Sequence, residues 1–101
     1  MFLYDLLDDI SYKLLIDKYE EDYLNSINYD NFMNIYKFFR SKKIYYIEDL
    51  IIYYLDIFTL DLDTIKKAIS ILEEKYGNDY VYIVGDNLKI LEDTILMILE
   101  R

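Results

Sequence analysis

The sequence predicts a small all-α domain, a bundle of about four to five helices joined by short connections. Apolar residues recur at the three- and four-residue spacing of a helix over most of the chain. Proline is absent and the only two glycines lie near the C-terminal end, so little interrupts the helices before them. With 101 residues, 54% of them apolar, the chain can form one core, which predicts a single compact acidic helical domain over residues 1–101.

The N-terminal segment carries two apolar stripes that are offset from each other. The first consists of Leu3, Leu6, Leu7, Ile10 and Leu14, and the second of Tyr12, Ile16, Tyr19 and Tyr23. Each stripe fits one face of a helix, and the change of face between them requires a bend. We therefore expect one long bent helix, or two helices joined near Ser11.

The next stripe predicts a helix from Asp30 to Arg40 that ends at the run SKK, residues 41–43. Its members are Phe32, Ile35, Tyr36 and Phe39. The segment that follows, IYYIEDLIIYYLDIFTLDLD at residues 44–63, is apolar on every side of a helix. Such a helix is normally buried on all sides, which places it at the centre of the bundle. Its expected core stripe is Ile47, Leu50, Ile51, Tyr54 and Phe58.

The apolar side chains of this central segment that lie outside the stripe need other cover. They are Ile44, Tyr45, Ile52, Tyr53 and Ile57. They either pack under the N-terminal helix or meet a second chain, because aromatic-rich and charge-poor surface is typical of interface cores. The candidate apolar interface residues from this set are Tyr45, Ile52, Tyr53 and Ile57.

Two helices are predicted in the C-terminal part. Leu62, Ile65, Ile69, Leu72 and Tyr76 form the stripe of the first, over residues 62–76, with Asp61 or Asp63 as N-cap and Gly77 as C-cap. Leu88, Leu91, Ile95 and Ile98 form the stripe of the second, over residues 87–100 and entered through Gly85, Asp86 and Asn87. The run YVYIV at residues 80–84 has the composition of a strand, and IYYI at residues 44–47 would be its partner in a short two-stranded ribbon. We favour a helical or irregular turn, because an isolated ribbon is only marginally stable.

The net charge of −9 is unevenly distributed. Residues 1–30 contain eight acidic and two basic side chains, whereas residues 48–65 contain five acidic side chains and no basic one. Like charges three or four positions apart destabilise a helix, so folding gives no reason to favour them. They either form a solvated face that keeps the domain soluble or meet a basic partner. The candidate partner-binding carboxylates are Asp5, Asp8, Asp9, Asp17, Glu20, Glu21, Asp22, Glu48, Asp49 and Asp56.

The residue types that most enzymes and metal sites need are missing. There is no histidine, no cysteine and no glycine-rich phosphate loop. Asp61, Asp63 and Asp86 are the best candidates for carboxylate chemistry, but helix capping explains the run DLDT at residues 61–64. We expect no catalytic residue, no metal site and no cofactor.

One stretch of the chain is basic. The run KFFRSKK, residues 37–43, mixes cationic and aromatic side chains between two predicted helices. Nucleic-acid binding through it would be opposed at long range by the net charge. We instead expect its cations to favour a helix C-terminus, to pair with the acidic regions, or to bind an acidic strip on a second copy.

Two functions fit this pattern. The first is a non-enzymatic inhibitor that occupies the basic nucleic-acid-binding cleft of a nuclease or related enzyme, by mimicry of the anti-CRISPR or anti-restriction type that phages make. The alternative is a small helical homodimeric regulatory, antitoxin or immunity-type protein that binds one cognate protein through a tyrosine-rich apolar face. The start of the chain lacks the pattern of a signal peptide and no window is apolar enough to span a membrane, so we expect a cytoplasmic protein.

Overall fold

The computed structural model describes residues 2–100, and all regular structure within that range is helical. The α-helices are α1 (Leu3–Leu6), α2 (Asp9–Lys18), α3 (Glu21–Ser26), α4 (Tyr29–Ser41), α5 (Ile47–Tyr53), α6 (Leu62–Tyr76), α7 (Tyr80–Asp86) and α8 (Lys89–Leu99). Two 3₁₀ helices, η1 (Leu55–Thr59) and η2 (Gly77–Asp79), lie between them. The predicted all-α class is confirmed, but the helices are shorter and more numerous than expected.

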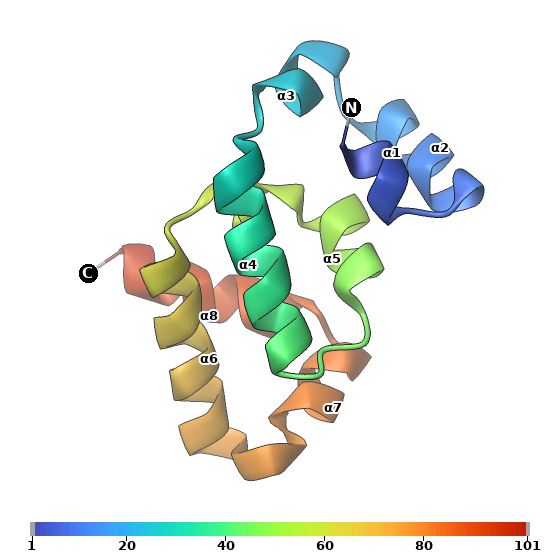
Figure 1. Ribbon diagram of the computed structural model, residues 1–101. Coiled ribbons are helices and arrows are strands. Elements are labelled where there is room, and N and C mark those ends of the chain that lie inside the picture. Colours follow the sequence, from blue (N-terminus) through green and yellow to red (C-terminus); the bar gives the residue numbers. More distant parts are fainter. Residues whose placement is uncertain (1, 101) are drawn as a thin grey trace.

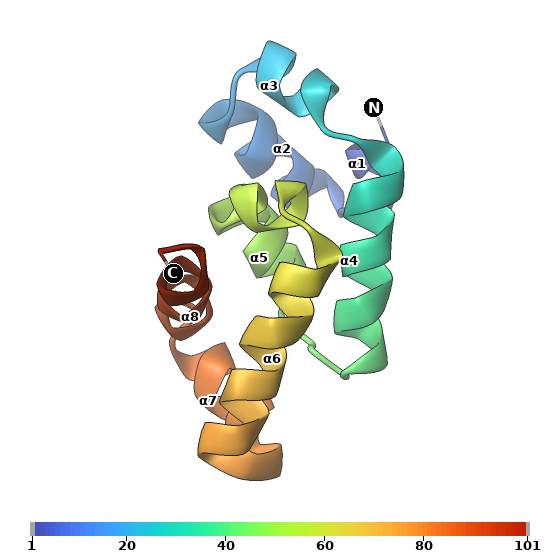
Figure 2. The same ribbon diagram turned by 90° about the vertical axis from the view of Figure 1, so that its left-hand side faces the viewer.

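Two long helices, α4 and α6, form the frame of the molecule (Figure 1). Helix α8 crosses behind α6 and makes the most extensive helix–helix contact of the fold with it. The three short helices α1–α3 gather at one end, and α5 lies beneath α2 and beside α4 (Figure 2). The acidic N-terminal helices and α5 are therefore neighbours in space.

Stacked phenylalanine rings lie at the centre of the core. Phe32 and Phe39 of α4 and Phe58 of η1 are all fully buried, and the ring centroids of Phe32 and Phe58 are 4.6 Å apart. Burial of each such side chain stabilises the fold by about 1.5–3 kcal/mol. The predicted core stripe is confirmed for Leu50 and Ile51, which are also inaccessible to solvent.

The central segment is not one helix, which differs from the expectation. Helix α5 ends at Tyr53, Tyr54 leaves the helical conformation with φ −137° and ψ 43°, and η1 follows in a new direction. Because of this break, two apolar faces find cover within the same chain. Ile52 and Ile57 are only 3% and 5% exposed. The segment is apolar on every side because it makes two short helices, each of which needs its own buried face.

The N-terminal prediction of one bent helix, or two joined near Ser11, is wrong. The chain breaks instead at Leu7 and Tyr19, both in extended conformation, and so forms three helices. Ser11 lies inside α2, where its backbone N–H donates to the Asp8 carboxylate at 2.7 Å. As a result, part of the proposed apolar stripe faces solvent: Ile10 is 77% exposed and Leu14 is 46% exposed.

The favoured helical turn is confirmed, because residues 80–86 are the helix α7, and the alternative of a two-stranded ribbon with residues 44–47 is wrong. Tyr80 and Val84 are one helical turn apart and both are buried, so the period of burial here is that of a helix. The two predicted helices around it are confirmed as α6 and α8. Gly77 ends α6 with φ +66°, as its predicted role as C-cap requires.

Candidate protein-binding surface

All ten candidate partner-binding carboxylates have exposed side chains. Within residues 2–100 the one ion pair joins Lys42 Nζ to Glu73 Oε1 at 3.0 Å, so none of the ten is paired with a cation there. We name the carboxylates of α1–α3 and their connections the acidic lobe. It consists of Asp5, Asp8, Asp9, Asp17, Glu20, Glu21 and Asp22.

The structure supplies a local reason for most of these carboxylates that the sequence argument missed. Because the chain forms many short helices, it has many helix N-termini, where a negative charge interacts favourably with the helix dipole. The candidate residues in first helical turns are Asp5, Asp9, Glu21, Asp22, Glu48, Asp49 and Asp56. Asp8 is the N-cap of α2, and the hydrogen bond from the Ser11 backbone lowers the pKa of its carboxyl. The expectation that folding gives these charges no role is therefore wrong.

Two carboxylates of the acidic lobe remain without such an explanation. Asp17 lies in the last turn of α2, where a negative charge interacts unfavourably with the helix dipole. Glu20 occupies the N-cap position of α3, but its side chain makes no capping hydrogen bond. Both side chains are exposed. Asp17 and Glu20 are thus the members of the lobe with the strongest case for a role outside folding.

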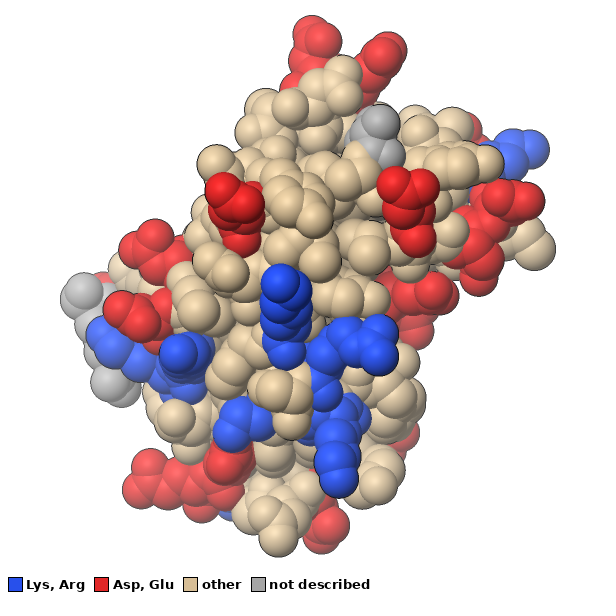
Figure 3. Space-filling view, in the orientation of Figure 1, with Lys and Arg blue, Asp and Glu red and all other residues tan. Residues whose placement is uncertain are grey.

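Packing of α2 on α5 places the two acidic regions of the sequence beside each other. In Figure 3 the edge of the molecule over α1, α2 and α5 is mostly acidic in this view. One of the two lysines of this region, Lys18, forms no ion pair within the described residues, and its ammonium lies 5.2 Å from the ring centroid of Tyr53. The lobe therefore keeps most of its negative charge uncompensated.

Asp56 has a structural partner that the sequence did not reveal. The hydroxyl of Tyr23 in α3 donates a hydrogen bond to the Asp56 carboxylate of η1. Burial raises the pKa of Tyr23, and the adjacent carboxylate raises it further. The bond joins two elements that are 33 residues apart in the chain. Asp56 therefore has a structural role, because its hydrogen bond joins η1 to α3.

The structure divides the candidate apolar interface residues into two pairs. Ile52 and Ile57 are buried inside the chain and need no partner. Tyr45 and Tyr53 are 66% and 52% exposed. Sequence reasoning missed Tyr82, which is 64% exposed with its ring centroid 6.2 Å from that of Tyr45. If residues 80–86 are taken as a helix, Tyr82 lies on the face opposite Tyr80 and Val84, and this pattern would have indicated that Tyr82 is exposed.

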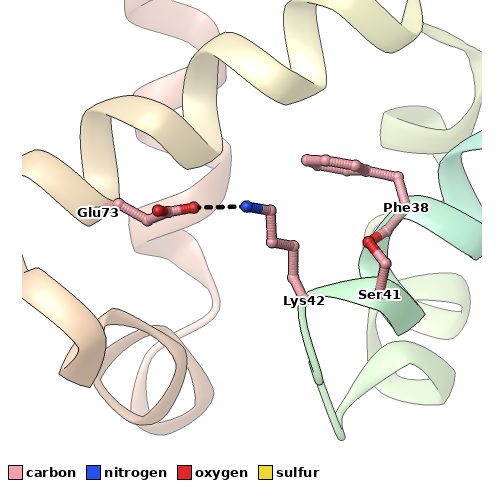
Figure 4. A network of polar contacts seen from close by, with 4 residues as sticks. All are labelled: Phe38, Ser41, Lys42 and Glu73. Atoms are coloured by element: carbon pink, nitrogen blue, oxygen red, sulfur yellow. Dashed lines mark hydrogen bonds and ion pairs between the residues drawn. The ribbon is translucent and has the colours of Figure 1, made fainter.

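Cationic side chains gather on the face of the molecule formed by α4 and α6 (Figure 3). We name the cations of α4, of the two residues that follow it and of the first half of α6 the basic band: Lys37, Arg40, Lys42, Lys43, Lys66 and Lys67. Phe38 lies among them, and the ammonium groups of Lys42 and Lys66 are 5.8 and 5.9 Å from its ring centroid. Figure 4 shows Lys42 reaching across to Glu73 of α6. The other five side chains are exposed and form no ion pair within the described residues.

The part of the chain that the structure describes holds no group of three or more acidic side chains placed to bind a metal ion. Nor does any described helix have the length and hydropathy to cross a bilayer. The surface chemistry is dominated by unpaired charge of both signs and by exposed tyrosines. Comparison with protein-family models, with curated proteins and with solved structures finds no match to this chain.

Proposed function

We propose that this protein is a non-enzymatic, cytoplasmic inhibitor that uses its acidic lobe to occupy the basic nucleic-acid-binding cleft of a nuclease or related enzyme. The observation that carries the proposal is the set of seven exposed carboxylates on α1–α3 and their connections, none of which forms an ion pair within residues 2–100. A negative surface of this kind accelerates and orients association with a cationic groove. Inhibitors of restriction and CRISPR enzymes are the class that this chemistry fits.

The packing of α2 on α5 also supports nucleic-acid mimicry. A strand of duplex DNA carries one phosphate per ~3.4 Å, whereas one carboxylate per helical turn gives one per ~5.4 Å. A single helix is too sparse to imitate a phosphate row. Packing of α5 on α2 brings Glu48 and Asp49 of a second element toward the acidic lobe and so raises the density of negative charge toward that of the nucleic acid.

A second candidate function rests on the exposed tyrosines. Tyr45 and Tyr82 present two neighbouring aromatic rings to solvent, and tyrosine is enriched at the centres of protein interfaces. A regulatory, antitoxin or immunity-type protein would use them to bind one cognate protein. Such an apolar contact persists at high salt, whereas binding through the acidic lobe weakens as salt screens the charges.

The proposal is tested by affinity capture from host extract with two variants of matched charge. The lobe variant carries Asp9→Lys, Asp17→Lys, Glu20→Lys and Glu21→Lys. The control variant carries Glu74→Lys, Asp79→Lys, Asp93→Lys and Glu100→Lys, which change the net charge equally at positions outside the lobe. We expect the control to capture a nucleic-acid-processing enzyme at low salt and the lobe variant to lose it. Equal capture by both variants would refute the role of the lobe.

A further inference from the structure

Opposite charges share one shallow pocket where α4 ends and α5 begins. Arg40 and Lys43 line it on the side of α4, and Glu48 of the first turn of α5 lines it as well, around a volume of about 410 Å³. None of the three forms an ion pair within residues 2–100. Both signs of charge at this site are therefore available to a partner.

The backbone at Lys43 is a second, independent observation at the same site. Lys43 has φ +60°, the one positive value among non-glycine residues in the described range. Glycine or asparagine normally occupies such a position after a helix, because a longer side chain is strained there. Here the positive φ ends α4, because the Ile44 N–H turns back to donate to the Phe39 carbonyl at 3.2 Å, and it leaves the Lys43 side chain exposed beside Arg40 at the rim of the pocket.

Aromatic rings lie beside this charged pocket. Tyr45 also lines it, and the neighbouring ring of Tyr82 extends the same exposed surface onto α7. Aromatic side chains surrounded by charged groups are typical of the anchors of a protein contact. The site thus combines a positive part, a negative part and an apolar part.

We propose that this face binds a second copy of the chain, with Arg40 and Lys43 of one copy against Glu48 and Asp49 of the other. Adjacent patches of opposite charge are self-complementary under a twofold rotation, which brings each positive patch onto the partner's negative patch. A twofold contact of this kind closes as a dimer and leaves no free end for further growth. Tyr45 lies within the contact and excludes water from the charged pairs.

Charge complementarity favours a second copy over a nucleic acid as the occupant. Figure 3 shows acidic side chains around the edges of the same face as the basic band. An extended phosphate backbone that crossed the basic band would run into these carboxylates, whereas a second copy offers each charge its opposite. The inference does not rest on the acidic lobe, because none of the seven carboxylates of the lobe is part of this contact.

Two charge-reversal variants test the dimer. One carries Arg40→Glu and Lys43→Glu, and the other carries Glu48→Lys and Asp49→Lys. Mass in solution is measured by light scattering and sedimentation for wild type, for each variant and for their equimolar mixture, up to about 1 mM protein. Circular dichroism of each variant confirms that it is folded.

We expect a wild-type dimer that dissociates at least about tenfold more readily when salt is raised. Each variant alone is expected to be monomeric, because its contact faces now carry like charges. The mixture is expected to form a one-to-one heterodimer, because the two faces are complementary again. A monomeric wild type, or variants that fail to associate when mixed, overturns the proposal.

A labelled oligothymidylate tests whether a nucleic acid, and not a second copy, binds this face. Its fluorescence anisotropy is measured with wild type and with the Arg40→Glu, Lys43→Glu variant at low salt. No binding by wild type agrees with the dimer. Binding that the variant loses, together with a monomeric mass for the wild type, would instead make the basic band a nucleic-acid site.

Discussion

At the scale of single residues, the hydroxyl groups of the half-buried Tyr23 and the buried Tyr46 differ in their hydrogen bonding. Tyr23 donates its hydroxyl to Asp56, whereas the hydroxyl of Tyr46 is buried without a hydrogen-bond partner in the described structure. A buried polar group without a partner costs about 1–3 kcal/mol, while a made hydrogen bond contributes about 1 kcal/mol. Removal of the hydroxyl is therefore expected to have opposite effects on the free energy of unfolding at the two positions.

Replacement of Tyr46 by phenylalanine is expected to raise the free energy of unfolding by about 1 kcal/mol, because it removes the unpartnered hydroxyl. Replacement of Tyr23 by phenylalanine is expected to lower it by a similar amount, because Asp56 loses its donor. Urea unfolding followed by circular dichroism measures both. Equal destabilisation by the two substitutions would contradict this assignment.

The same tyrosines predict a loss of stability at alkaline pH. Burial is the main reason that the pKa values of Tyr23 and Tyr46 lie above the ordinary value of 10.0. The folded state therefore retains phenolic protons that the unfolded chain releases. Their contribution is fully present below about pH 10 and is lost as the pH rises toward their folded values. Urea unfolding from about pH 9 to about pH 12 is expected to show this decline, and the Tyr23→Phe, Tyr46→Phe double variant a smaller one. An identical decline in wild type and double variant would rule out these two groups as its source.

Substitution of Asp17 tests whether its charge contributes to folding. Because Asp17 lies in the last turn of α2, Asp17→Asn is expected to stabilise the protein by a few tenths of a kcal/mol. Asp9→Asn, at the first turn of the same helix, is the matched control and is expected to destabilise it by a similar amount. Thermal unfolding measures both. If Asp17→Asn lowers stability, Asp17 has a structural role that the geometry does not explain.

At the scale of helices, the sequence predicted the helix bounds well where one apolar stripe coincided with one helix. Helices α4, α6 and α8 were predicted within two residues of their observed ends. The sequence did not predict the helix bounds where two apolar faces overlapped. The breaks at Leu7, Tyr19 and Tyr54 carry no glycine or proline, so they arise because the tertiary packing gains more from two differently directed helices than from one continuous helix.

The ends of α4 and α6 offer a contrast between two residues with positive φ. Gly77 has φ +66° and ψ −155°, a conformation open essentially to glycine alone, so Gly77→Ala is expected to cost about 1–3 kcal/mol. Lys43→Gly is expected to stabilise by about 1 kcal/mol, because it relieves strain at φ +60°. Chemical denaturation measures both changes. Destabilisation by Lys43→Gly would show that the Lys43 side chain contributes to the fold itself.

At the scale of the whole molecule, the distribution of charge was predictable in sequence but not in space. The net charge and the positions of its acidic and basic stretches follow from the composition alone. The sequence could not show that α2 packs on α5, or that α6, which carries Lys66 and Lys67, packs beside α4 and its cations. Nor could it separate the buried Ile52 and Ile57 from the exposed Tyr45 and Tyr53, because that division depends on the break at Tyr54.

The central claim is that the acidic lobe and a nucleic acid compete for one cationic groove. The most direct measurement is displacement of a labelled nucleic acid from the captured enzyme, followed by fluorescence anisotropy as the protein is added. We expect wild type and the Glu74, Asp79, Asp93, Glu100 control to displace the nucleic acid fully, and the lobe variant to require at least about tenfold more protein. Nucleic acid that stays bound while the enzyme is saturated with wild-type protein would contradict the claim.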